Sequence, residues 1–102
     1  MFIVLLKFSG DKSKVGQFME GHNAWIKRGF DDGVFLLTGS LQPGSGGGIL
    51  AHNTSLPDLT ARVNDDPFVI ENLVSAEILE ISPARTDERL VFLRTDLRAI
   101  AT

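Results

Sequence analysis

Residues 2–8 of the chain read FIVLLKF, a short run in which six of the seven residues are apolar. Its apolar side chains occupy both alternating faces, with Phe2, Val4, Leu6 and Phe8 on one and Ile3 and Leu5 on the other. A short apolar run of this kind predicts a β-strand that is buried on both sides. The strand must therefore lie in a sheet whose two faces are both covered.

The segment after this strand changes to a helical period. Beyond a turn at residues 9–11, apolar residues recur with i, i+3, i+4 and i+7 spacing from Lys12, which predicts an amphipathic helix ending near residues 29–33. The residues on its apolar side are Val15, Phe18, Met19, His22, Trp25, Ile26, Gly29 and Phe30. We expect Trp25 and Phe30 in the core or at a subunit contact, with stacking on a substrate as the alternative.

The remaining elements complete an α+β pattern. They are predicted strands at residues 34–38, 49–52 and 73–81, and a helix from Ser55 to about Asn64. The glycine-rich residues 42–48 form a flexible hairpin connection. The order β-α-β-β-α-β predicts the ferredoxin-like split arrangement, in which an antiparallel sheet carries both helices on one face.

Such a sheet leaves its second face bare, although the first strands are apolar on both sides. A large exposed apolar face requires a cover. The simplest cover is a second copy of the same sheet, because a chain of 102 residues buries only part of its surface alone. We therefore expect a homodimer through the sheet face, a dimeric α+β barrel, with the C-terminal tail as the alternative cover.

The tail is expected to be an extension of the main domain. Residues 1–82 form the predicted ferredoxin-like domain, and residues 83–102 form a C-terminal extension that packs on the dimer. Near-helical spacing predicts a helix in this extension, carried by Leu90, Leu93, Leu97 and Ile100. Residues 90–93 could instead form a short strand. The tail arginines fit a solvated face, with a membrane or anionic-ligand role as the alternative.

Composition narrows the class of protein. Ten basic and thirteen acidic residues are interspersed and give a net charge of −3, which argues against nucleic acid as a partner. No basic residues precede the apolar start, and Lys7 interrupts it, so it does not fit a secretory signal. We expect a cytoplasmic protein without a membrane partner. The absence of cysteine excludes disulfides, thiolate catalysis and cysteine metal ligands.

One ionisable residue, His22, falls on the apolar side of the first helix. It is either a core histidine hydrogen-bonded to the backbone or one half of an acid–base pair. In such a pair, burial disfavours the charged imidazole and a nearby carboxylate favours it, so the ring can accept and release a proton near neutral pH. Asp66 is the candidate partner. Pro67 keeps Asp66 out of the α region, so the second helix should end and the chain should turn there. Asp66 could also serve only to shape that turn.

Other candidate residues carry weaker signals. Phe68 either touches a ligand beside Asp66 or packs under the turn. His52 could join His22 and an acid at a metal site, but two histidines without a paired motif are weak evidence, and we expect no metal. Residues 44–48 are no phosphate loop, because they lack the following Lys-Ser/Thr pair and join two strands. They form a mobile hairpin and a candidate lid.

Taken in order, these segments resemble the YCII-related (YciI-like) family over about residues 2–81. The matching features are the opening FIVLL, the helix with His22 and Trp25, Gly33 before LLTGS at residues 36–40, the glycines before Ile49, Asp66-Pro67-Phe68, and SAEI at residues 75–78. Their order and spacing are specific for the fold more than for an activity. The tail after Pro83 departs from the short strand-like ending of the family.

The resemblance implies a dimeric α+β barrel, similar in architecture to muconolactone isomerase-like proteins. It implies a cleft in which His22 and Asp66 form an acid–base pair, with Ser40 lining the same cleft. A characterised relative is a dehydrochlorinase acting on a chlorinated hydroxyhydroquinone, and most of the family has no assigned reaction. Two function classes stay open: a cofactor-free lyase or isomerase for small cyclic metabolites, and a non-catalytic dimer that binds a small molecule or assists another enzyme.

Overall fold

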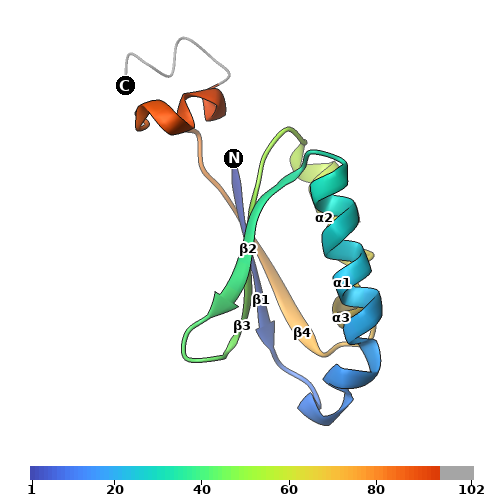
Figure 1. Ribbon diagram of the computed structural model, residues 1–102. Coiled ribbons are helices and arrows are strands. Elements are labelled where there is room, and N and C mark those ends of the chain that lie inside the picture. Colours follow the sequence, from blue (N-terminus) through green and yellow to red (C-terminus); the bar gives the residue numbers. More distant parts are fainter. Residues whose placement is uncertain (95–102) are drawn as a thin grey trace.

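The central strand of the molecule is β1 (Phe2–Phe8), which pairs on both sides within one antiparallel sheet. The other strands are β2 (Phe35–Leu41), β3 (Gly46–Ala51) and β4 (Val74–Glu80), in the order β2-β3-β1-β4. This is a computed structural model, and it describes residues 1–94. Figure 1 shows the helices on one side of the sheet, so the predicted ferredoxin-like α+β fold class is confirmed.

The helices begin close to the residues that the sequence predicted. A 3-10 turn, η1 (Lys12–Lys14), leads into α1 (Val15–Asp31), so the long helix begins slightly later than the sequence predicted. Helix α2 (Leu56–Asn64) begins at the predicted residue, because the side chain of Ser55 accepts a hydrogen bond from the backbone of Asp58. A further one-turn helix, α3 (Pro67–Ile70), lies where the sequence predicted only a turn.

The core lies between the sheet and the helices. Val4, Ala51 and Leu59 are fully buried there, and Trp25 is 2% exposed. The indole Nε1 of Trp25 donates a hydrogen bond of 2.8 Å to the backbone oxygen of Arg62, which ties α1 to α2. Trp25 is therefore a core residue, whereas Phe30 is largely exposed.

The opposite face of the sheet carries exposed apolar side chains. Leu37 is 54% exposed, and Leu79 and Ile81 are each 43% exposed. In β1 three of the four residues under the helices are buried, whereas Ile3 and Leu5 on the other face are only half-buried. In the single chain, therefore, β1 is buried on one of its two faces, and the expected burial of the other face is not seen.

The described part of the tail lies beyond one end of the sheet, near the N-terminus (Figure 1). It contains a 3-10 helix, η2 (Glu88–Leu93), so the short strand considered for residues 90–93 is not formed. Phe92 packs edge-on against His52, with ring centroids 5.7 Å apart. The predicted helical residues Leu97 and Ile100 lie outside the described residues. Within residues 1–94, none of the helices has the length and apolar character needed to span a bilayer.

Candidate functional site

Helix α1 brings one stripe of side chains over the sheet. Met19, His22, Asn23 and Ile26 follow the i, i+3, i+4, i+7 spacing and line the same cavity. This stripe lies next to the core stripe that carries Trp25. His22 therefore lies at the boundary between the buried core and the cavity, and its side chain keeps 14% of its surface exposed.

The short helix α3 holds Asp66 in place. Asp66 is the N-cap of this helix, and Pro67 occupies its first turn, a common pairing at helix starts. Its Oδ1 atom accepts a hydrogen bond of 3.1 Å from the backbone N–H of Phe68. The side chain is fully buried, which makes Asp66 the one buried charged residue within residues 1–94.

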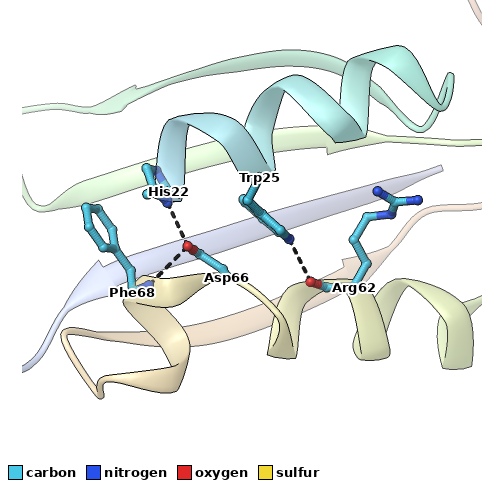
Figure 2. Close-up of polar contacts among 5 residues, drawn as sticks. All are labelled: His22, Trp25, Arg62, Asp66 and Phe68. Carbon is cyan, nitrogen blue, oxygen red and sulfur yellow. Dashed lines mark hydrogen bonds and ion pairs between the residues drawn. The ribbon is translucent and has the colours of Figure 1, made fainter. Parts of the chain in front are cut away.

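The two candidate acid–base residues meet at this point. His22 Nδ1 lies 2.8 Å from Asp66 Oδ1 (Figure 2), so α1 and the start of α3 are joined through their side chains. An ionised carboxylate can only accept hydrogen bonds, so Nδ1 is the donor when Asp66 is ionised. The neutral ring then carries its lone pair on Nε2. Within the described part of the chain, Asp66 Oδ2 has no hydrogen-bond partner.

Phe68 fixes the plane of the histidine ring. The two ring centroids are 4.0 Å apart and the ring planes differ by 5°, which is a stacked arrangement. The ring of Trp25 lies farther away, at 5.8 Å. One hydrogen bond and one stacking contact together leave the imidazole little freedom, so Nε2 keeps a fixed direction. Phe68 is only 5% exposed, and it both packs under the turn and lines the cavity.

The cavity lies between the α1 stripe and the hairpin end of the sheet. It measures about 260 Å³, close to the lower limit of roughly 300 Å³ for sites of drug-sized ligands. Leu6 and Ile49 form part of its floor, and Ser40 on β2 lies in its lining as the resemblance implied. Its walls are mostly apolar, with a few polar groups.

His52 does not join this site. It lies in a separate depression at the other end of the sheet, with Asn53, Phe92 and Leu93. Across residues 1–94, no cluster of three or more His, Asp, Glu or Cys side chains is placed to hold a metal ion. The structure therefore brings together His22, Asp66, Phe68 and Ser40, and it separates His52 from them.

Sequence reasoning missed several cavity residues. Asn23 and Ile26 could have been found, because their spacing from His22 places them on the same stripe of α1. Thr38 and Gly47 could not, since they reach the cavity through strand register: Thr38 pairs with Ile49, and Gly47 pairs with Ser40.

A comparison with solved structures agrees with this fold. No family model matches the chain, and no curated protein does. Among solved structures, it is similar to 5-chloro-2-hydroxyhydroquinone dehydrochlorinase from Burkholderia phenoliruptrix AC1100, solved in complex with 2,5-dihydroxybenzoquinone. The TM-score is 0.64 at 13% sequence identity, and the match covers 79% of this chain and 93% of that chain. At this identity the likeness establishes a shared fold.

Proposed function

We propose that this chain is a lyase of the dehydrochlorinase type, which acts on a small cyclic hydroxyquinone through His22 and Asp66. The observation that carries the proposal is the hydrogen bond of 2.8 Å between a fully buried carboxylate and a histidine at the wall of a small cavity. The shared fold with a dehydrochlorinase supports the choice of reaction. We also propose that the chain is a divergent member of the YCII-related family.

In the proposed mechanism, His22 Nε2 is the base. In a keto tautomer of a chlorinated hydroxyhydroquinone, chlorine is attached to a tetrahedral ring carbon. Nε2 takes the proton of a ring hydroxyl, and the O–H electron pair forms a carbonyl. Ring electrons then shift, the C–Cl bond breaks, and chloride departs with the bonding pair. The net change is loss of HCl, which balances without an oxidant, a reductant or a cofactor.

The residues around His22 each have a role in the proposed proton transfer and chloride loss. Asp66 keeps the proton on Nδ1 and stabilises the imidazolium that forms when Nε2 is protonated, as the aspartate does in a catalytic triad. Phe68 holds the ring plane. Ser40, which is exposed at the cavity lining, donates a hydrogen bond to a ring oxygen of the substrate. Burial of Asp66 strengthens its interaction with the imidazolium, because little water screens it.

We further propose that two copies pack through their sheet faces. The exposed side chains of Leu37, Leu79 and Ile81 give this face an apolar surface that a second copy can bury. The described part of the tail lies at the end of the sheet rather than across this face, which favours a second copy over the tail as the cover.

A second candidate function is non-catalytic binding of a small molecule. One observation favours it: Asp66 already has a structural task as the N-cap of α3, so its pairing with His22 does not require catalysis. In that case the cavity binds its ligand without converting it, and the dimer acts as a binding or accessory protein.

Chloride release from 5-chloro-2-hydroxyhydroquinone separates the two candidates. The lyase proposal predicts enzyme-dependent release by the wild type and loss of release in His22→Ala. Undiminished turnover in the variant contradicts His22 as the base. Binding of the hydroxyquinone without release by the wild type favours the second candidate.

A further inference from the structure

A glycine in the cavity floor has no structural reason to be a glycine. Gly47 lies in the interior of β3, where it pairs with Leu6 on one side and Ser40 on the other. Directly paired residues point to the same face of a sheet, and Leu6 is buried under the helices. A side chain at position 47 would therefore project toward α1, into the cavity that His22 lines.

The backbone does not require glycine at this position. Gly46 has a φ of 147°, but Gly47 is not among the glycines with a positive φ. Packing does not require it either, because an added Cβ at Gly47 meets only the backbone oxygen of Gly39, at an ordinary distance of 3.5 Å. By contrast, a Cβ at Gly46 would collide with the backbone oxygen of Leu6. Gly46 is therefore structural, and Gly47 is not.

Glycine in a strand interior weakens the strand, because it loses more conformational entropy on folding than other residues and has no side chain to pack. Glycine in a strand interior also marks sites where a ligand or another backbone approaches the strand closely. Here that space is the cavity itself. Opposite Gly47 are apolar groups of α1 and the wall formed by His22 and Phe68.

We propose that Gly47 determines the specificity of the site, by letting one planar ring lie against the bare backbone of β3. The inference rests on the proposed function and adds where the hydroxyquinone ring lies: flat against β3, between that strand and α1. The Ser40 hydroxyl then lies beside the ring edge, because Ser40 is the direct partner of Gly47. A side chain at position 47 takes the space of the ring in the cavity.

The test compares Gly47→Ala with Gly16→Ala in the full chain. Gly16 lies in α1 outside the cavity lining, and a Cβ added there has nothing within 4 Å. The probe is 2,5-dihydroxybenzoquinone, with binding measured by calorimetry and folding by thermal melting. We expect Gly47→Ala to fold as stably as the wild type and to bind at least about tenfold more weakly, the effect of one methylene in a tight pocket. Gly16→Ala should bind as the wild type does.

A Gly47→Ala variant that binds normally or fails to fold overturns the role of Gly47 and leaves the His22–Asp66 proposal standing. Equal weakening in both alanine variants also overturns it. A wild type that does not bind 2,5-dihydroxybenzoquinone overturns the proposed function together with this inference.

Discussion

The rings of His22 and Phe68 lie face to face, 4.0 Å apart and within 5° of parallel. The same phenylalanine donates its backbone N–H to Asp66 Oδ1, the atom that also contacts His22 Nδ1. One residue therefore supports both halves of the proposed acid–base pair, and each half can be tested by a separate substitution.

Replacing Phe68 by another apolar residue should lower turnover more than it lowers stability. Phe68→Leu retains an apolar side chain in the core, so the free energy of unfolding should fall by less than about 2 kcal/mol. The flat stacking surface is lost, and turnover should fall about tenfold or more because Nε2 loses its fixed direction. Urea unfolding and chloride release measure the two effects. Unchanged turnover in a folded variant contradicts the role of Phe68 in orienting the ring.

Asp66→Asn separates capping from catalysis. Asparagine caps helices as well as aspartate does, so α3 should remain formed and stability should change by about 1 kcal/mol or less. The charge that stabilises the imidazolium is lost, and turnover should fall about 100-fold or more. Chloride release with circular dichroism as the folding control decides the matter. A variant as active as the wild type means that Asp66 acts only as a cap.

The core tryptophan provides a contrast. Trp25→Phe removes the hydrogen bond to the Arg62 backbone and leaves a smaller ring in the core, so unfolding should become easier by about 1–3 kcal/mol. Affinity for 2,5-dihydroxybenzoquinone, measured by calorimetry, should stay within about twofold of the wild type, because Trp25 faces the core and is not part of the cavity lining. A large loss of affinity at preserved stability would restore the substrate-stacking role for Trp25.

The proposed dimer contact at the exposed sheet face can be tested by introducing a charged residue there. Leu37→Glu places a carboxylate at the exposed apolar position of β2, and the mass in solution should fall from twice the chain mass to 11.1 kDa. Leu56→Glu is the matched control, because Leu56 is an exposed leucine at the start of α2, where an acid is tolerated. Light scattering coupled to size-exclusion chromatography gives the masses. A monomeric wild type contradicts the proposed dimer.

The sequence predicted the fold class because periodicity reports which face of each element is buried. The β1 pattern, the α1 stripe and the Ser55 cap are local signals, and each leads to an element that the structure contains. Helix α3 was missed, although an aspartate followed by proline is itself a helix-start signal. The turn expected at Asp66 and the observed one-turn helix lie at nearly the same place in the chain.

The site was harder to predict than the fold. His22 and Asp66 are 44 residues apart in sequence, and only the packing of α1 against α3 brings them to 2.8 Å. The position of Gly47 in the cavity follows from strand register, which the flexible hairpin sequence did not reveal. The stacking of Phe68 on His22 depends on side-chain rotamers, about which spacing carries no information.

The most direct test of the proposed site is nitrogen NMR of the histidine rings during titration with 2,5-dihydroxybenzoquinone. The chain has two histidines, and His52 lies in a separate depression, so it serves as an internal control. We predict that the Nε2 signal of His22 shifts in a saturable way, that Nδ1 keeps its proton, and that His52 does not change. A saturable shift at His52, or no change at His22 up to the solubility limit of the ligand, contradicts the assignment of this cavity as the site.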